Sequence, residues 1–310
     1  FVILPRVFSD LHLSFRRQCH MCISITLTIG ISVMLYVQIS CACKKTTAIL
    51  IILLSLVVYP ISFVQASDKD SVVVFVHGAH LTASSWEKVE LGLKQKGYNS
   101  MAVNLPGRHD SVNPKEITLS TSAKALCKVV SKINKNVVYI AHSQAGAVVN
   151  HAMSLCPAVN IDSVIYIASV SPLDGEKPFD KLSKIDEENY YKGVGYDENT
   201  GLMVINNKDA FVKSFSSEEK SLLKEEILSA AVSEPAYIAE GVVKLDVDKF
   251  NALKKFYIFT ENDRIISKTS QVAIAKRLTT SKTVTIESGH IPMVTHSEKL
   301  TALVIDFLAI

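Results

Sequence analysis

Short apolar runs recur between residues 71 and 308, and segments with helical spacing of apolar residues separate them. The first run, Ser-Val-Val-Val-Phe-Val at 71–76, is a continuous apolar stretch, typical of a strand covered on both faces. Such strands alternate with helical patterns of about 10–15 residues, which predicts an α/β fold: a mostly parallel sheet with helices on both faces. The predicted strands are 71–76, 98–103, 137–141, 164–168, 256–260 and 283–286.

One long stretch interrupts this alternation. Residues 172 to about 247 contain polar segments, such as 186–189, and a helical segment at 218–231, but no strong strand pattern. An insertion of this size between two sheet strands usually covers something. We therefore expect a helical lid insertion over the carboxyl edge of the sheet, and the alternative is a peripheral helical decoration.

The amino-terminal part has a different pattern. Two apolar runs, 21–43 and 46–67, contain no charged residue, and Lys44-Lys45 separates them. The second run follows this basic pair and ends at Val-Gln-Ala (64–66), which resembles a small-x-small cleavage site. This layout is that of a secretory signal peptide.

We therefore expect residues 1–66 to be a leader, cleaved near Ala66, and residues 67–310 to be one exported domain, periplasmic or secreted. Two alternatives stay open. Each apolar run approaches the length of about 20 residues that spans a bilayer, so the leader could be an uncleaved membrane anchor. A translation start placed upstream of the true one would also explain residues 1–43, which hold four of the six cysteines.

Charge and composition exclude several classes of protein. With 48% hydrophobic and 20% charged residues, the chain is not a disordered or low-complexity one. The formal charge of +3 comes from the leader, because residues 67–310 carry 28 Lys and Arg against 29 Asp and Glu. The balanced charge of the folded part gives no reason to expect that it binds nucleic acid.

Cys127 and Cys156 could form a disulfide in an exported protein, or be two buried free thiols.

The strongest candidate for chemistry is Ser143. The strand 137–141 runs into this serine, and a helix follows with no room for a loop. Such a sharp turn exposes the hydroxyl at the top of a sheet, beside the amino end of a helix. The usual pattern is Gly-x-Ser-x-Gly, whereas Ala141 and Ala145 stand at the two glycine positions, followed by Gly146.

Three further features stand at other strand ends. His77-Gly78-Ala79 follows the first strand, Asp263 follows the strand 256–260, and His290 follows the last one. A serine hydroxyl needs a histidine to take its proton and a carboxylate to orient that histidine. The order Ser, Asp, His is that of one fold, in which the amides of Ala79 and Gln144 form the oxyanion hole. Asp174 is a rival for the acid, and His80 is a candidate substrate contact.

These residues resemble the α/β-hydrolase superfamily, and most of all its small-lid esterases, which include plant methyl-ester esterases, hydroxynitrile lyases and bacterial relatives. The resemblance spans about residues 71–308 and implies that Ser143 is the nucleophile, His290 the base and Asp263 the acid. Ala79 and Gln144 carry over as oxyanion donors. The motifs are His77-Gly78-Ala79, Ser85-Trp86, Asn104-Leu105-Pro106-Gly107-Arg108-His109, Ala141-His142-Ser143-Gln144-Ala145-Gly146, Asp263-Arg264-Ile265-Ile266 and Gly289-His290.

The resulting prediction is a serine hydrolase that cleaves a small-molecule carboxylic ester through an acyl-enzyme. An amide or lactone substrate stays open, whereas a lyase is disfavoured because Ile291, rather than lysine, follows His290. The alternatives are a non-catalytic or weakly catalytic binding protein on the same fold, which Ala141 and Ala145 permit, and a membrane protein that functions through its leader. Neither metal-ligand spacing nor a glycine-rich phosphate loop is found, so no metal and no cofactor is predicted.

Overall fold

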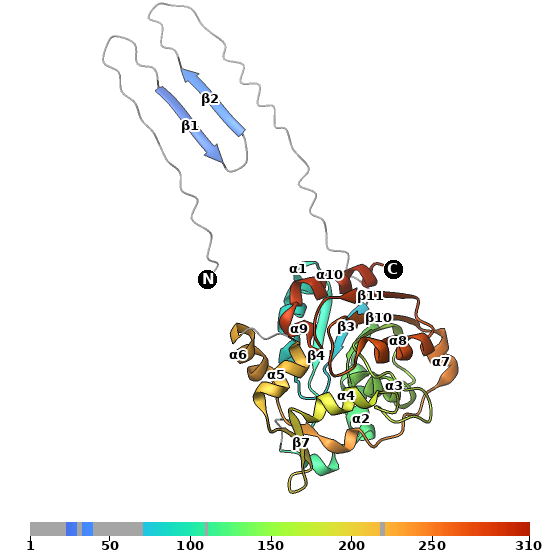
Figure 1. Cartoon of the computed structure of the whole chain (residues 1–310). Helices are drawn as coiled ribbons and strands as arrows, with labels where there is room; N and C mark the ends of the chain where they lie inside the picture. Colours follow the sequence, from blue (N-terminus) through green and yellow to red (C-terminus); the bar gives the residue numbers. More distant parts are fainter. Residues whose placement is uncertain (1–22, 30–32, 40–70, 109–110, 218–220) are drawn as a thin grey trace, which may run out of the picture. The chain divides into compact units, whose positions relative to one another are not determined.

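The computed structural model describes residues 23–29, 33–39, 71–108, 111–217 and 221–310 (Figure 1). The chain divides into two units, residues 1–61 and 62–310. In the first unit, β1 (Ile23–Ile29) pairs antiparallel with β2 (Val33–Ile39). The rest of the expected leader, including the cleavage site near Ala66, lies outside the described residues. None of the described helices combines the length and hydropathy needed to span a bilayer.

A six-stranded parallel sheet forms the centre of the second unit. All six predicted strands are present, with ends that differ from the predicted ones by at most three residues, and the α/β prediction is confirmed. The strand order is β11-β10-β6-β5-β3-β4, and every neighbouring pair is parallel. The strands are β3 (Ser71–Val76), β4 (Asn99–Val103), β5 (Asn136–His142), β6 (Ile161–Ile167), β10 (Lys254–Thr260) and β11 (Lys282–Ile286).

The order of the strands places the helices. The chain moves from β3 to β4 in one direction and from β4 to β6 in the other, and crossovers between parallel strands are right-handed. This puts α1 on one face and α2, α3 and α8 on the other, while α10 packs on α1. The direction reverses at the neighbouring strands β3 and β5, and the carboxyl ends of strands at such a reversal are the usual ligand position in these sheets. The helices are α1 (Glu87–Gln95), α2 (Leu119–Val130), α3 (Ala145–Leu155), α8 (Lys268–Arg277) and α10 (Ser297–Leu308).

The core consists of strand side chains covered on both faces, as the continuous apolar runs predict. Phe75, Tyr139, Tyr166 and Tyr257 are at most 1% exposed. The only tryptophan, Trp86, lies between β3 and α1 and stacks on Phe75, with ring centroids 4.8 Å apart. This stacking fixes the path of the chain from β3 towards α1.

Local signals set the helix ends. Thr118 and Thr121 form a reciprocal capping box at the start of α2, which satisfies backbone donors of the first turn. The Ser267 side chain accepts the N–H of Ser270 at the start of α8. A short helix, α7 (Val247–Ala252), leads into β10, and α9 (Pro292–Thr295) starts at a proline, whose missing N–H costs nothing in the first turn.

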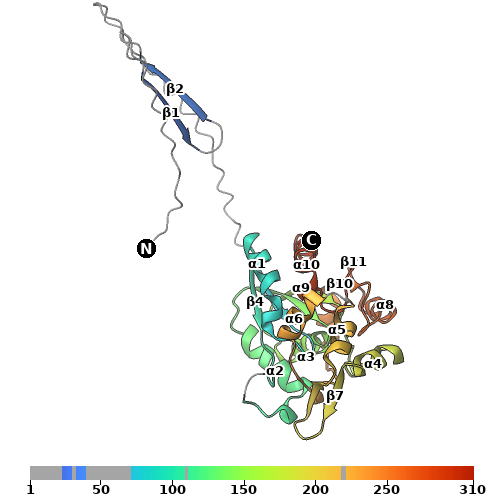
Figure 2. The same cartoon turned by 60° about the vertical axis from the view of Figure 1, so that its left-hand side comes forward.

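The insertion, residues 172–247, contains the expected helices and also a small sheet that the sequence analysis did not predict. Its strands β7, β8 and β9 have at most four residues, too short for alternation to show. Helix α4 lies next to α5 and β7, and all three belong to the same cluster in both views (Figures 1 and 2). The elements are α4 (Lys184–Tyr191), β7 (Val194–Asp197), β8 (Leu202–Ile205), α5 (Lys208–Ser216), α6 (Ser221–Ala230) and β9 (Glu234–Pro235).

Cys127 and Cys156 form a disulfide, with Cα atoms 5.7 Å apart, which ties α2 to the end of α3.

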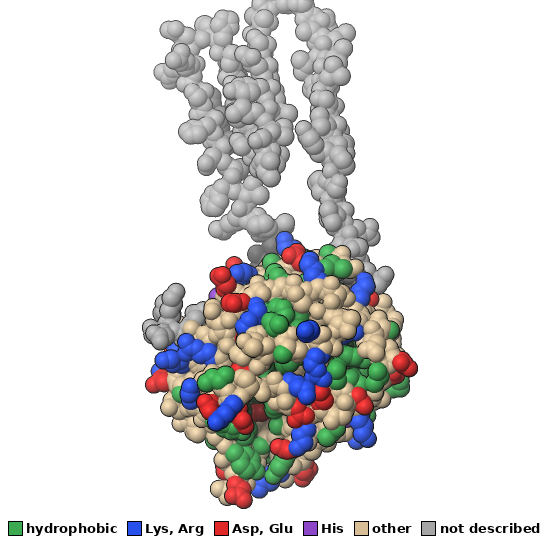
Figure 3. Space-filling view, turned by 45° about the vertical axis from the view of Figure 1, so that its right-hand side comes forward, with side chains coloured by type: hydrophobic (Ala, Val, Ile, Leu, Met, Phe, Trp, Pro, Cys, Tyr) green, Lys and Arg blue, Asp and Glu red, His purple; other side chains and the backbone are tan. Residues whose placement is uncertain are grey.

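The face shown in Figure 3 has acidic and basic side chains interspersed, with no extended patch of one sign, which agrees with the balanced charge of residues 67–310.

Removing the disulfide should lower stability without changing the fold. The bond closes a loop with a sequence separation of 29 residues, and a loop of this length restricts the unfolded chain by about 3–4 kcal/mol. We expect the double variant Cys127→Ala/Cys156→Ala to lose about this free energy of unfolding in urea titrations. Wild type in reducing buffer is the control, and equal stability in all three samples would contradict the prediction.

Candidate active site

Four loops meet at the carboxyl edge of the sheet, and each carries a residue singled out from the sequence. Ala79 follows β3, Ser143 follows β5, Asp263 follows β10 and His290 follows β11. The first two strands are direct neighbours in the sheet, with Val76 paired to Ala141. Residues far apart in the sequence are therefore brought to one place by the parallel topology.

Ser143 has a left-handed backbone conformation, with φ of 53° between the end of β5 and the start of α3. This region is uncommon for residues other than glycine and stores strain. Hydrogen bonds on both sides hold it in place. The Ser143 N–H donates to the Ile167 carbonyl (3.1 Å), and its carbonyl accepts from the Val170 N–H (3.2 Å) and the Ser169 hydroxyl (2.9 Å).

Close packing around Ser143 explains the small residues near it. A Cβ atom at Gly78 would lie 2.7 Å from Ser143 Cβ, and one at Gly146 would lie 2.1 Å from Ser169 Oγ. The glycine that the turn requires is therefore Gly146, one position after the usual one. Ala141 and Ala145 are fully buried at the two positions of the usual motif, so their methyl groups fit there.

His290 connects Ser143 to Asp263. Its Nε2 lies 2.8 Å from Ser143 Oγ, and its Nδ1 lies 2.8 Å from Asp263 Oδ2. A proton on Nδ1 faces the carboxylate, which leaves Nε2 to accept the serine proton. The Asp263 carboxylate also accepts the N–H groups of Ile265 (2.8 Å) and Ile266 (2.9 Å), so its orientation is fixed. Ser143, Asp263 and His290 are at most 6% exposed.

The rival carboxylate takes no part in this arrangement. Asp174 is exposed, and its Oδ1 accepts the N–H of Leu245 (2.9 Å). The structure brings Asp263, and not Asp174, to His290.

Two residues other than Ser143 and Asp263 also hold the loop that carries His290. The His290 N–H donates to the Phe215 carbonyl (2.8 Å), at the end of α5, and the Phe215 ring contacts the His290 ring edge-on at 5.6 Å. On the other side, His142 Nε2 donates to the His290 carbonyl (2.8 Å). Burial lowers the pKa of His142 well below its usual range, so its ring is neutral. The insertion thus contacts the His290 loop directly.

The next feature is the pair of backbone amides expected to bind the oxyanion. Within the described part of the chain, no acceptor pairs with the N–H of Ala79 or of Gln144. His77 holds the first of these loops, because its Nδ1 donates to the Gly78 carbonyl (3.0 Å) and its Nε2 accepts the Leu105 N–H (3.1 Å). In a trans peptide the carbonyl and the next N–H point in opposite directions, so fixing the Gly78 carbonyl also fixes the Ala79 N–H.

His80, the expected substrate contact, is fully buried in this structure, and both of its ring nitrogens already have partners within the protein. Burial lowers the pKa of His80 to about 4. Its partners come from the insertion. Sequence reasoning did not find these contacts, since Glu234 and Tyr190 lie more than 100 positions from His80 and belong to no motif.

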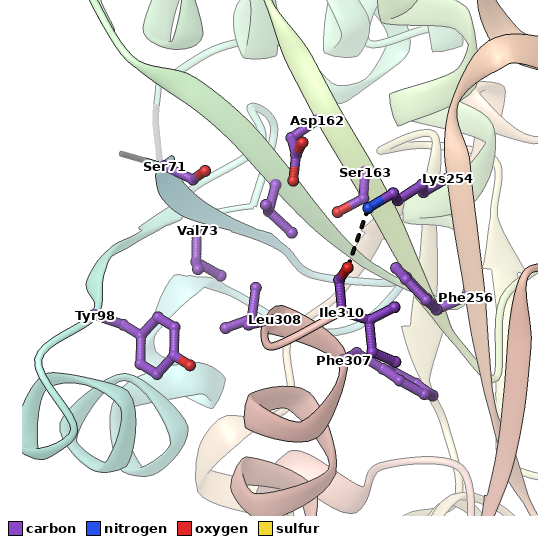
Figure 4. Close-up of a pocket in the computed structure, with 11 residues that line it drawn as sticks. Ser71, Val73, Tyr98, Asp162, Ser163, Lys254, Phe256, Phe307, Leu308 and Ile310 are labelled. Carbon is purple, nitrogen blue, oxygen red and sulfur yellow. Dashed lines mark hydrogen bonds between the residues drawn. The ribbon is translucent and has the colours of Figure 1, made fainter. Parts of the chain in front are cut away.

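A cavity of about 290 Å³ lies at the other edge of the sheet (Figure 4). It is lined by residues at the starts of β3, β5, β6 and β10 and by the end of α10, and Lys254 Nζ donates there to the Ile310 carbonyl (3.2 Å). It is therefore separate from the Ser143 site, which stands at the strand ends. Among the described residues, no group of three or more His, Cys, Asp or Glu side chains is arranged to hold a metal ion.

The chain matches the alpha/beta hydrolase family over residues 73–303. It belongs to that family. The match includes Ser143, Asp263, His290 and the loop with Ala79, so the family relation covers the whole site.

The relatives of this alpha/beta hydrolase include esterases. It is 26% identical to the pFDCC methylesterase MES16 of Arabidopsis thaliana over 233 residues, which are 70% of this chain and 86% of that protein. The structure of polyneuridine aldehyde esterase is similar with a TM-score of 0.67 and 19% identity, over 77% of this chain and 99% of that chain. An extracellular alpha/beta-hydrolase from a Paenibacillus species has a TM-score of 0.63 and 18% identity, over 76% and 98%. The resemblance to plant methyl-ester esterases is confirmed, and ester hydrolysis in general is supported.

The buried histidines predict a loss of stability in mild acid. Burial lowers the pKa values of His77, His80 and His142 in the folded protein, whereas histidine side chains in the unfolded chain have pKa values near 6.5. Below pH 6.5 the unfolded state therefore binds more protons, and stability falls as the pH falls. Between pH 7.5 and 5.5 we expect each histidine to cost about 1.4 kcal/mol of unfolding free energy, as measured by urea titration. In the variant His80→Asn, the unfolding free energy lost between pH 7.5 and 5.5 should be smaller by about 1.4 kcal/mol than in wild type. An equal loss in the variant and in wild type would contradict the lowered pKa of His80.

Proposed function

We propose that this protein is a serine esterase that hydrolyses a neutral small-molecule carboxylic ester through an acyl-enzyme. The observation that carries the proposal is the hydrogen-bond chain from Ser143 through His290 to Asp263, next to the Ala79 and Gln144 amides, which have no acceptor among the described residues. An activated serine beside free N–H donors is the arrangement that acyl transfer requires. The esterase relatives support the same reaction class.

The reaction would begin with attack of Ser143 Oγ on the ester carbonyl while His290 Nε2 takes its proton, and the Asp263 carboxylate stabilises the imidazolium that forms. The amides of Ala79 and Gln144 donate to the developing oxyanion. His290 then gives the proton to the leaving alcohol, which departs and leaves an acyl group on Ser143. Water activated by His290 attacks this acyl group and releases the acid.

The walls of the site indicate an uncharged substrate. Phe211 and Phe215 stack on each other at 4.1 Å, and Tyr190 contacts Phe215, so a cluster of aromatic rings from the insertion touches His290 through Phe215. The buried charges of this region, Arg108 and Glu234, already pair with each other. An ester with an apolar body fits such walls, because a charged one would lose its hydration without gaining a partner.

The second candidate function is binding without turnover. Ser143 is only 4% exposed beneath the insertion, which suits retention of a small molecule as well as its hydrolysis. The Paenibacillus hydrolase likewise shares structural and functional homology with a tobacco salicylic acid binding protein. Measurement of turnover separates the two functions.

Substitution of the serine should abolish hydrolysis. In protein from residue 67 onward, we expect Ser143→Ala and His290→Ala each to lower kcat with p-nitrophenyl acetate by at least about 10³-fold, because either change removes the activated nucleophile. Wild type should react with a fluorophosphonate probe, and Ser143→Ala should not. A well-folded wild type that neither reacts with the probe nor turns over esters would make binding the better proposal.

The acid is tested by a matched pair of carboxylate variants. Asp263→Asn should lower kcat by about 10³–10⁴-fold, because the amide cannot stabilise the imidazolium. Asp174→Asn should leave kcat near the wild-type value, since its carboxylate contacts the Leu245 amide and not His290. The reverse pattern would move the acid to Asp174.

We also propose that the domain is exported after cleavage near Ala66. The proposal rests on the signal-peptide pattern of residues 44–66 and on the disulfide, which persists in oxidising compartments. Expression of the full chain in a secreting host should give a mature amino terminus within a few residues of Ser67, determined by mass spectrometry of the intact protein. Full-length protein that resists carbonate extraction from membranes would instead establish an uncleaved anchor.

A further inference from the structure

His80 directly follows Ala79, and the insertion engages every polar group that it has. Its N–H donates to Glu234 Oε2 (3.2 Å), and its carbonyl accepts the Val232 N–H (3.0 Å). In the side chain, Nδ1 donates to the Val232 carbonyl (2.9 Å), and Nε2 accepts the Tyr190 hydroxyl (2.8 Å). Four hydrogen bonds between one loop residue and the insertion are more than simple covering of the site requires.

The backbone of His80 is also unusual. Its φ of 61° lies in the left-handed region, which a non-glycine residue adopts only where its surroundings hold it there. No part of the side chain is exposed, and its ring contacts those of Tyr190, Phe211 and Phe215 at 5.7–5.9 Å between centroids. The insertion therefore supplies both the hydrogen bonds and the packing that keep His80 in this conformation.

A buried ion pair extends the contact to a second loop. Glu234 Oε1 pairs with Arg108 at 2.6 Å, both side chains are 2% exposed, and Arg108 donates to the Pro106 carbonyl (3.0 Å). The Glu234 carboxylate thus joins the loop after β3 to the loop after β4, through one oxygen each. Because Glu234 is anchored by Arg108, it holds the His80 amide at a fixed place relative to the sheet.

We propose that His80 is a positioning residue, through which residues 232–234 of the insertion hold the Ala79 amide in the geometry that binds the oxyanion. This inference rests on the proposed esterase function. His77 fixes the peptide before Ala79, and the insertion fixes the peptide after it. The Ala79 N–H is then oriented from both sides, while no acceptor in the described part of the chain pairs with it.

This role differs from contact with substrate. Both ring nitrogens of His80 are already bonded within the protein, so the side chain has no free donor or acceptor to offer. The insertion also holds His290, through the Phe215 carbonyl. The insertion therefore holds both the loop that carries the Ala79 amide and the base, His290. When the insertion packs against the sheet, both groups are in position.

The test compares three variants in otherwise intact mature protein. His80→Phe keeps the ring packing and removes both side-chain hydrogen bonds. His80→Asn tolerates a positive φ and keeps a donor near the position of Nδ1. Lys88→Met is the matched control, because it breaks the exposed Lys88–Glu226 ion pair between α1 and the insertion and leaves the His80 contacts intact.

We expect His80→Phe to lower kcat about 10–100-fold with KM within about twofold, less than the 10²–10³-fold typical of losing an oxyanion donor altogether. A boronic acid forms a tetrahedral adduct with the serine, so its affinity should fall by the same factor as kcat. His80→Asn should recover part of both losses, and Lys88→Met should match wild type. Should His80→Phe not fold, Tyr190→Phe removes one of these hydrogen bonds and should give a smaller decrease in the same direction.

Other outcomes overturn the inference. A folded His80→Phe with wild-type kcat and boronic acid affinity would show that His80 positions nothing. A raised KM with unchanged kcat would make His80 a substrate contact. In both cases Ser143→Ala would still distinguish an esterase, whereas a wild type without ester turnover or boronic acid binding would overturn the proposed function itself and this inference with it.

Discussion

The strained turn at Ser143 is the constraint on which the rest of the site depends. A left-handed conformation at a non-glycine residue costs about 1–3 kcal/mol, so it persists only if its neighbours enforce it. The enforcing contacts are backbone hydrogen bonds to Ile167 and Val170, at the end of the adjacent strand β6. Strand pairing in the centre of the sheet therefore holds the serine, and the stability of the buried core is what supports this strain.

The strand ends and the residues at them could be predicted from the sequence because each depends on local signals. The runs at β3, β5 and β10 are apolar, continuous and bounded by turns, and parallel strands buried on both faces leave no other pattern. Ser143 follows β5 directly, Asp263 comes shortly after β10, and His290 comes shortly after β11, a more polar strand. The parallel topology then brings them together without further information, because all of these strands end at the same edge.

The contacts of the insertion could not be predicted in this way. Strands β7, β8 and β9 are too short to show a period, and their pairing depends on tertiary contacts. Glu234 and Tyr190 look like ordinary polar and aromatic residues of a lid until the fold places them against His80. For the same reason a substrate contact was the natural expectation for His80, since nothing in the sequence shows which partners occupy its nitrogens. The cysteines show the same limit, because their spacing admits a bond but only the packing of α2 on α3 brings them together.

The contacts that the insertion makes with the rest of the domain differ in strength. The insertion adjoins a site in which Ser143 is only 4% exposed. Its contacts with His80 and His290 contribute to the geometry on which the chemistry depends. The buried Arg108–Glu234 pair is costly to separate, because either partner alone would be a buried, unpaired charge. The Lys88–Glu226 pair at α6 is exposed and contributes little. Of these two contacts, the one at Glu234 is therefore the stronger, and it belongs to the segment that contacts the oxyanion loop.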